Sequence, residues 1–287
     1  MTFSIAAMDA AAQTWGVAVA SKFLAVGAVV PFAQAGIGAV ATQAFIKIGF
    51  GRDGLALMSS GHSAADTLAL LLKDDPRAAD RQVGVVDALG GAAAHTGAAC
   101  YDWAGHIVGE GFTCQGNVLA GAQVIEAMAA AFRSTGGALE TRLYAALVAG
   151  DQAGGDRRGR QAAGIVVVKS GGGYGGDTDR YLDLRVDDHA DPVAHLGGLL
   201  KMHHLYFGRP DPADLLPIDA VLARELQTLS QRLGYTRAEA TGVWDATSMQ
   251  AFWALVSSEN LEERWSPEAT PQHIDRVALT YLRERYG

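Results

Sequence analysis

The second residue of the chain, Thr2, carries a hydroxyl group that can act as a nucleophile once it becomes the N-terminal residue. Methionine aminopeptidases remove Met1 when the next residue is small, and threonine meets that condition. The α-amine then exposed has an unperturbed pKa of about 7.7–8.0, so it can be neutral and accept the hydroxyl proton. The apolar segment Phe3–Met8 follows directly and predicts a strand that fixes the nucleophile. Ser4 also offers a hydroxyl, but it lies inside this strand and has no amine.

Polar residues at the ends of two further predicted strands can complete a site around Thr2. Ser21 ends one of these strands and Lys22 follows it. A cation at Lys22 would keep the Thr2 amine neutral by like-charge repulsion, so we expect both residues to be catalytic. Thr42 and Gln43 end the second strand, and we expect their side chains to bind the substrate.

Two amide side chains flank a glycine at Gln115, Gly116 and Asn117, where a strand is expected to pass into a helix. We expect Asn117 to cap that helix, because asparagine is favoured at this position. The backbone N–H groups at a helix start can hold an oxyanion or a carboxylate. Asn117 is therefore a catalytic candidate, and Gln115 is a substrate-binding candidate.

A charged loop, residues 156–160, precedes an apolar strand. Loops at strand starts often line pockets, and arginine guanidinium groups bind carboxylates through two parallel hydrogen bonds. We therefore expect Asp156, Arg158 and Arg160 to bind substrate or to organise the site.

An acidic cluster with a histidine, at Asp187, Asp188 and His189, suggests a metal-dependent hydrolase as an alternative. Adjacent residues on a strand point to opposite faces, however, and no compact pair of histidines one helical turn apart accompanies them. A hydrogen-bond network is the favoured interpretation, and we expect no metal or other cofactor.

The elements that must position these residues follow from hydropathy patterns and turn residues. Strands are predicted at Phe3–Met8, Trp15–Ser21, Ala25–Val30, Ile37–Thr42, Val83–Asp87, Ala92–Thr96, Ile107–Cys114, Ile165–Lys169 and Tyr181–Val186. Helices are predicted at Gly51–Ser60, Ser63–Leu72, Asn117–Arg133, Ala138–Ala149 and Asp191–Tyr206. Strands that arrive in runs, without alternating with helices, favour an α+β fold: a four-layer α/β/β/α sandwich of two mostly antiparallel sheets.

Composition restricts the class of protein and of partner. Hydrophobic residues make up 49% of the 287 residues and charged residues 19%, which is typical of a folded soluble protein. The net charge of −8 argues against nucleic acid as a partner. No apolar run reaches the roughly 18 residues of a membrane span, so no membrane association is expected. The start of the sequence lacks a signal-peptide pattern, which predicts a cytoplasmic protein.

Several segments resemble the bacterial and archaeal family known as domain of unknown function 1028. They are MTFSIAA, GVAVASKFLAVGAVVPFA, GAVATQA, QVGVVD, TGAACYDWAGH, QGNVLAG, GGDRRGRQAAG and LRVDDHADP. The resemblance covers about residues 1–205. It implies membership of the N-terminal-nucleophile hydrolases, which share the α/β/β/α sandwich and cleave amide bonds.

The C-terminal part is similar to a peptidoglycan-binding-like module of three helices. Gly242, Trp244, Asp245 and Thr247 match its characteristic turn. We therefore expect a sandwich domain at residues 1–206, a linker at 207–219 and a small helical domain at 220–287. A lid or dimerisation role for this module is an alternative to glycan binding.

The resulting hypothesis is an amidohydrolase that attacks a small amide, ureide or peptide-like compound through Thr2. We expect a small-molecule amide as partner and a homo-oligomer, most simply a dimer. Two alternatives stay open. One is a non-catalytic binding or assembly protein on the same fold, and the other is the metal-dependent hydrolase.

Overall fold

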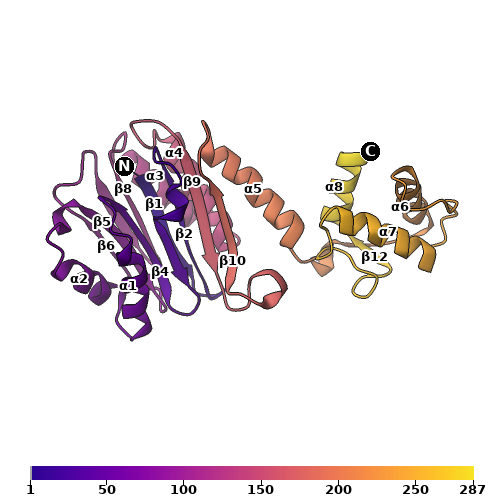
Figure 1. The fold of residues 1–287 in the computed structure, drawn as a ribbon, viewed down its shortest axis with the longest axis horizontal. Coiled ribbons are helices and arrows are strands. Elements are labelled where there is room, and N and C mark those ends of the chain that lie inside the picture. Colours follow the sequence, from indigo (N-terminus) through magenta and orange to yellow (C-terminus); the bar gives the residue numbers. More distant parts are fainter. Residues whose placement is uncertain (1) are drawn as a thin grey trace. The chain divides into compact units, whose positions relative to one another are not determined.

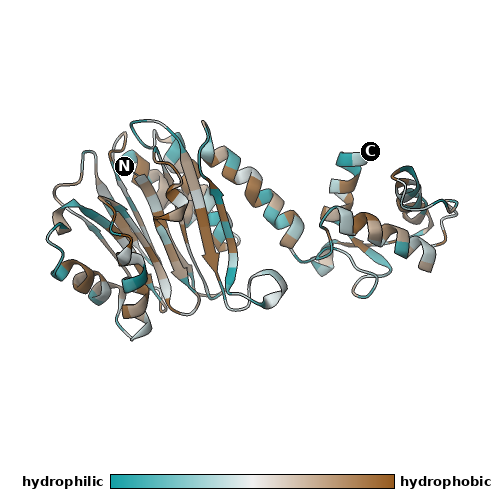
Figure 2. Cartoon of the chain, viewed as in Figure 1, coloured by the Kyte–Doolittle hydropathy of each residue, from teal (hydrophilic) through white to brown (hydrophobic). Residues whose placement is uncertain are grey.

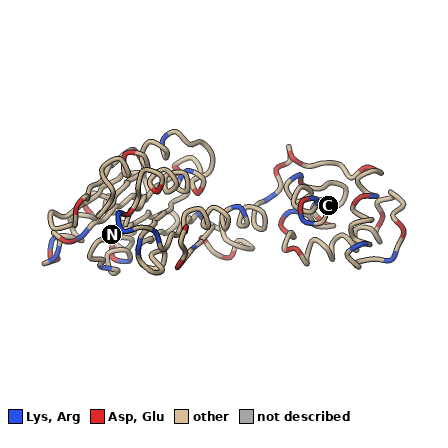
Figure 3. Tube along the Cα trace, turned by 90° about the horizontal axis from the view of Figure 1, so that it is seen from above, with Lys and Arg blue, Asp and Glu red and all other residues tan. Residues whose placement is uncertain are grey.

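The computed structural model describes residues 2–287, which divide into two compact units. The first unit ends at Leu199 and the second runs from Leu200 to Gly287, so the division falls within one helix. Met1, whose removal would expose the Thr2 α-amine, lies outside the described residues. Acidic and basic residues are interspersed along the trace of both units (Figure 3). Within residues 2–287, no helix combines the length and the apolar character needed to cross a bilayer.

The larger sheet of the first unit has six antiparallel strands in the order β10-β9-β2-β1-β8-β7. Their bounds are β1 Thr2–Asp9, β2 Thr14–Ser21, β7 Gly105–Gly109, β8 Phe112–Asn117, β9 Ala162–Val168 and β10 Arg180–Val186. β1 is thus a central strand, paired with β2 on one side and β8 on the other. Its side chains are buried on both faces up to Met8, which explains why its sequence is almost continuously apolar.

The smaller sheet has four antiparallel strands in the order β3-β4-β5-β6. They are β3 Pro31–Gln34, β4 Gly38–Ala44, β5 Arg81–Asp87 and β6 Ala92–Thr96. β4 packs on β1, and β5 packs on β8, so the two sheets lie face to face. A shared core that includes Ala6, Met8, Trp15, Ala39 and Ala41 fills the space between them.

Helices cover the outer faces of both sheets (Figure 1). The helices of the first unit, the last continuing into the second, are α1 Gly49–Ser59, α2 Ala64–Lys73, α3 Gln123–Ser134, α4 Leu139–Gln152 and α5 Pro192–Phe207. α1 and α2 pack on strands of the four-stranded sheet, while α3 and α4 pack on strands of the six-stranded sheet. Apolar residues concentrate on the strands between these helices (Figure 2).

The second unit is a small helical module. It contains α6 Ala220–Arg232, α7 Ala246–Ser258, α8 Arg276–Tyr286 and a two-stranded sheet of β11 Leu215–Pro217 and β12 His273–Asp275. Asp219, Asp245 and Asp275 accept backbone N–H bonds at the starts of α6, α7 and α8, which satisfies donors that have no partner inside a helix. Phe252 and Trp265 lie fully buried in its core.

The α+β class, the two antiparallel sheets with packed helices and the small helical C-terminal region are confirmed. Local sequence rules also held where they depend on neighbouring residues. Ser63 caps α2 and accepts the backbone N–H of Asp66, as the capping pattern predicts. The strands predicted at Val83–Asp87 and Ala92–Thr96 form the hairpin of β5 and β6, in which Gly90 adopts a positive φ of 83°.

Two predicted strands were wrong, and two strands were not predicted. The strand expected at Ala25–Val30 is a short 3₁₀ turn at Val26–Ala28, because Ala25 adopts a left-handed φ of 51° and binds Asp187 O through its N–H. The strand expected at Ile107–Cys114 is the hairpin of β7 and β8, which turns at Gly111 with a φ of 70°. Strand β3 was missed, and β11 lies inside the segment expected to be a linker.

Candidate functional site at the Thr2 edge of the sheets

Thr2 begins the central strand β1, at the edge where its two neighbouring strands end. It pairs with Asn117, the last residue of β8. On the other side, Ser21 ends β2, and its Oγ lies 3.1 Å from Thr2 Oγ1. Thr2, Ser21 and Asn117 are all buried. The strand register therefore gathers three of the predicted site residues at one point of the sheet.

Gln43, a buried residue of β4, connects the two sheets next to Thr2. Gln43 Nε2 donates to Gln82 Oε1 at 2.8 Å and lies 3.3 Å from the carbonyl oxygens of both Thr2 and Gln115. Its Oε1 accepts the hydroxyl of Ser4 at 2.7 Å. Ser4 Oγ in turn accepts Gln115 Nε2 at 2.7 Å. Gln43 thus holds the backbone of the candidate nucleophile from the opposite sheet.

Gln82, at the start of β5, extends this network. We call the hydrogen-bonded side chains of Ser4, Gln43, Gln82, Gln115 and Asn117 the amide chain. Gln82 Oε1 accepts Asn117 Nδ2 at 2.8 Å. Its Nε2 lies 2.7 Å from Gly116 O, 3.0 Å from Thr96 Oγ1 and 3.1 Å from Gly105 O. Because these buried groups are neutral and mutually bonded, they orient fixed dipoles at the Thr2 edge without the desolvation cost of a buried charge.

Two buried oxygens of this region have no hydrogen-bond partner among residues 2–287: Thr113 Oγ1 and Gln115 Oε1. Both face Gly84 on β5. A Cβ placed on Gly84 would lie 2.2 Å from Gln115 Oε1 and 2.3 Å from Thr113 Oγ1. Glycine at this position therefore leaves the space that the two β8 side chains occupy between the sheets.

The charged loop predicted at residues 156–160 supports the Ser21 end of β2. Asp156 accepts the backbone N–H of Lys22 at 2.8 Å, and its side chain is also bound by Arg158 at 2.9 Å. Gln161 N donates to Ser21 O at 3.1 Å. Asp156 is buried, and its bonds attach this loop to the end of β2.

The remaining basic candidates have partners away from Thr2. Lys22 is exposed, and its Nζ donates to Arg160 O at 3.3 Å. Arg160 forms an ion pair with Asp151 at 2.7 Å, and the hydrogen bond from that carboxylate raises the pKa of Arg160. Arg158 is committed to Asp156.

Thr42 faces away from the amide chain, because alternate residues of β4 point to opposite faces. Its Oγ1 donates to Lys47 O at 3.4 Å, whereas Gln43 reaches the backbone of the other sheet. The Thr42 backbone N–H donates to Val30 O at 3.2 Å. Thr42 is buried, and its hydroxyl is bonded to the loop after β4.

The expected helix cap at Asn117 was wrong. α3 begins six residues later, at Gln123, and no side chain caps it. Asn117 instead extends β8, because strand pairing with Thr2 continues to this residue, and Val118 then turns the chain with a φ of 53°. Its amide remains at the Thr2 edge, but through the sheet.

The alternative metal cluster has local partners. Gln161 Nε2 donates to Asp188 Oδ1 at 3.0 Å, and Asp191 N donates to His189 Nδ1 at 2.9 Å. Across residues 2–287, no three His, Cys, Asp or Glu side chains are placed to hold one metal ion. The geometry therefore gives the metal-dependent alternative no ligand set at Asp187, Asp188 and His189.

An ion pair stabilises the loops next to the amide chain. Arg81, which precedes Gln82, binds Asp75 with a Nε–Oδ2 distance of 2.7 Å and also donates to Phe45 O. Both side chains of the pair are buried. The hydrogen bond from Arg81 lowers the pKa of Asp75 below its usual value.

A small cavity of about 10 Å³ adjoins Ser21 and Asp156. Its walls also include Phe3, Asp151 and Arg160. This volume corresponds to roughly one water molecule.

Two residues of the amide chain were not predicted, Gln82 and Ser4. Gln82 is the first residue of the segment QVGVVD. A polar residue at the start of an apolar strand is common, so the sequence gives no sign of its bonds to the other sheet. Ser4 was set aside only as a nucleophile. Alternation along β1 would have placed it on the same face as Thr2.

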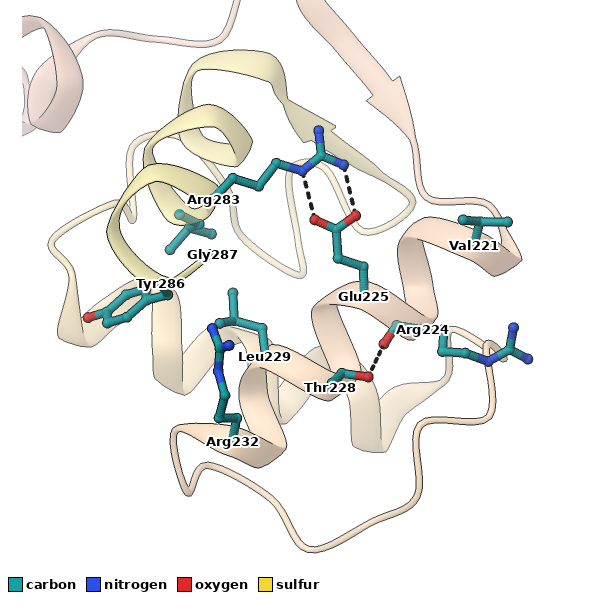
Figure 4. A pocket seen from close by; sticks show the side chains of 10 residues that line it. Val221, Arg224, Glu225, Thr228, Leu229, Arg232, Arg283, Tyr286 and Gly287 are labelled. Carbon is teal, nitrogen blue, oxygen red and sulfur yellow. Dashed lines mark hydrogen bonds and ion pairs between the residues drawn. The ribbon is translucent and has the colours of Figure 1, made fainter.

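The second unit has its own pocket, of about 410 Å³, between α6 and α8 (Figure 4). Glu225 and Arg283 bridge it with bonds of 2.7 and 2.8 Å. Leu229, Leu282 and Tyr286 also line it. The pocket thus combines apolar surface with charged groups.

Comparison with known proteins follows the same division of the chain. Residues 2–196 match a family described as "Family of unknown function (DUF1028)", and residues 206–282 match one described as "Putative peptidoglycan binding domain". The crystal structure of protein SPO2555 from Silicibacter pomeroyi, also assigned to DUF1028, superposes with a TM-score of 0.64 at 30% identity. The match covers 71% of this chain and 89% of that chain. No curated protein matches. The resemblance noted in the sequence is confirmed.

Proposed function

This chain belongs to the DUF1028 family, and from that premise we propose that it is an N-terminal-nucleophile amide hydrolase with Thr2 as its nucleophile. The resemblance of the family to N-terminal-nucleophile hydrolases implies this class. Two facing antiparallel sheets with helices on their outer faces are what that class requires.

The observation that carries the proposal is the position of the Thr2 hydroxyl. It lies on the central strand at the sheet edge, 3.1 Å from Ser21 Oγ. The Thr2 carbonyl lies 3.3 Å from the buried amide of Gln43, and the strand pairs with Asn117. The hydroxyl is thus bonded from β2, and the backbone of the same residue is fixed by β8 and by the facing sheet, which pre-organises Thr2 for attack.

The reaction would proceed in two steps. Thr2 Oγ1 attacks the amide carbonyl, and its proton passes to the α-amine exposed by removal of Met1. The C–N bond then breaks, the leaving amine takes that proton, and an ester on Thr2 remains. Water, deprotonated by the same α-amine, attacks the ester and regenerates the hydroxyl. The side-chain amide of Asn117 has two N–H groups, and one of them donates to Gln82 Oε1. The other N–H is the candidate donor to the oxyanion.

The test is covalent labelling by a β-lactone, which opens on a nucleophilic hydroxyl and leaves an ester. Three forms are compared by intact mass and peptide mapping. They are the processed protein, Thr2→Ala, and a form with one glutamate inserted between Met1 and Thr2. The bulky insert blocks methionine removal but keeps the threonine. We expect labelling at Thr2 in the processed protein alone. Equal labelling of the form with the insert would exclude the α-amine as base. Absence of labelling in verified processed protein would favour the non-catalytic alternative.

For the second unit we propose binding to peptidoglycan, supported by the family match at residues 206–282. Such a ligand lies in the cell envelope, so this proposal favours an envelope location over the cytoplasmic one expected from the sequence. Co-sedimentation of the full chain with insoluble peptidoglycan tests it. Arg232→Ala, in the pocket of Figure 4, should reduce sedimentation, and exposed Arg237→Ala is the control. A full chain that stays in the supernatant would leave the lid or dimerisation role.

A further inference from the structure

Five large apolar side chains are exposed in loops that adjoin the strand ends at the Thr2 edge. Their exposed fractions are 50% for Phe23, 60% for Leu24, 42% for Phe45, 46% for Ile48 and 62% for Tyr101. We call these five residues the apolar rim. Single exposed apolar residues are ordinary, but several on adjoining loops around one site indicate a binding surface.

The first part of the rim is attached directly to the strand that carries Ser21. Phe23 and Leu24 follow that residue by two and three positions. Their loop is fixed at both ends, by the bond of Lys22 N to Asp156 and by that of Ala25 N to Asp187 O at 2.9 Å. These bonds fix the backbone of the loop, and both side chains remain exposed to solvent.

The second part is attached to the facing sheet. Phe45 follows Gln43 by two positions, and its N–H donates to Asp80 O at 3.2 Å. Its ring lies 6.0 Å from the Tyr101 ring in an edge-to-face arrangement, and the Arg77 guanidinium lies 4.5 Å above it. Contacts of this kind orient the rings without burying them.

Tyr101 is also tied to the strand that pairs with Thr2. Its carbonyl accepts the N–H of Val118, the residue after Asn117, at 3.0 Å. Rim residues are therefore linked to three neighbours of Thr2. Phe23 and Leu24 follow Ser21, Phe45 follows Gln43, and Tyr101 is bonded to the residue after Asn117. Fixed apolar groups around a nucleophile lose little conformational entropy when a substrate covers them.

We propose that the apolar rim binds the acyl part of the substrate, so that the amides cleaved carry an aromatic or branched aliphatic group next to the carbonyl. This inference rests on the proposed function of Thr2. It narrows the substrate class from any small amide to apolar acyl amides.

Two β-lactones that share the reactive ring test it, one with a benzyl substituent and one with a hydroxymethyl substituent. The benzyl compound should label Thr2 about 10–100-fold faster, which is the range expected from covering one aromatic side chain. Phe45→Ala and Tyr101→Ala should each reduce that ratio severalfold, and Phe23→Ala provides a variant on the other sheet. Leu89→Ala is the matched control, because Leu89 is 94% exposed in the turn after β5, at the opposite end of the strands.

The outcomes separate the two proposals. Labelling of Thr2 by both compounds at equal rates would overturn the role of the rim and leave the nucleophile in place. Absence of labelling by either compound would overturn both. If Phe45→Ala converts a dimer into monomers in size-exclusion chromatography with light scattering and leaves the ratio unchanged, the rim is a self-association surface and the inference is wrong.

Discussion

The hydroxyl oxygens of Thr2 and Ser21 lie 3.1 Å apart at the adjacent ends of β1 and β2. Antiparallel pairing of the two strands places them there, because Phe3 stands opposite Ala20. A second hydroxyl at this distance can exchange a hydrogen bond with the nucleophile and carry its proton toward the amine.

Ser21→Ala should therefore slow labelling of Thr2 by a β-lactone about 10-fold, the equivalent of one lost hydrogen bond of roughly 1.4 kcal/mol. The melting temperature should change little, since only one oxygen is removed. Labelling rates at several pH values provide the measurement, with Ser60→Ala on the surface as control. A rate equal to that of the unmodified protein would limit Ser21 to a structural role.

Gln43 is the residue whose removal should disturb most of the buried amide chain. Gln43→Met keeps the length of the side chain but removes the acceptor of the Ser4 hydroxyl and the bond from Gln43 to the Thr2 carbonyl. We expect a loss of about 2–3 kcal/mol in the free energy of unfolding. Urea titrations measure it, and exposed Gln152→Met, at the end of α4, should stay within about 0.5 kcal/mol of the unmodified protein. Equal losses of stability at both positions would show that the bonds of Gln43 add nothing to the free energy of unfolding beyond what an exposed glutamine contributes.

The placement of Thr2 could be anticipated from sequence because it depends on one local fact, an apolar strand that begins directly after it. Ser21, Gln43 and Asn117 are candidates because each stands at the end of an apolar run, and the structure places all three beside Thr2. The local rules could not show which strands are neighbours. For that reason Gln82 was overlooked, although its side chain joins the same chain of amides.

Asn117 shows how a local rule can select a residue that lies beside Thr2 for a different structural reason. An asparagine before an apolar, helix-like segment favours a helix cap. Pairing with Thr2 across the sheet took precedence and kept Asn117 in β8. For Arg160, the positive charge suggests that it binds the carboxylate of a ligand. In the structure, its guanidinium group forms an ion pair with Asp151 of the protein itself.

The pair of Arg81 and Asp75 predicts a pH dependence of stability. Arg81 lowers the pKa of Asp75 in the folded protein, so the pair stabilises the fold at pH values above the unfolded pKa of about 3.9. The contribution is lost as the pH falls through the lower, folded-state pKa. Asp75→Asn should therefore cost about 2–3 kcal/mol near pH 7, and the difference from the unmodified protein should shrink below about pH 4.

Urea midpoints between pH 7 and pH 3 check this dependence. Asp74→Asn is the neighbouring control, because Asp74 is exposed, and it should remain within about 0.5 kcal/mol throughout. A difference at Asp75 that stays constant down to pH 3 would show that the carboxylate charge does not contribute.

Gly84 tests whether the space between the sheets is as closely filled as the amide chain requires. Gly84→Ala would place a methyl group 2.2 Å from Gln115 Oε1, so Gln115 must move and weaken its bond to Ser4. We expect a loss of about 1–3 kcal/mol and slower labelling of Thr2, because the strain is transmitted to the strand that bears the nucleophile. Gly198→Ala is the matched control: nothing lies within 4 Å of its added methyl group, and it sits in α5, where alanine is favoured by up to about 1 kcal/mol. Opposite signs in urea titration are the expected result. A Gly84→Ala variant as stable as the unmodified protein would mean that Gln115 has room to move, and the amide chain could then not hold Thr2 from the side of β8.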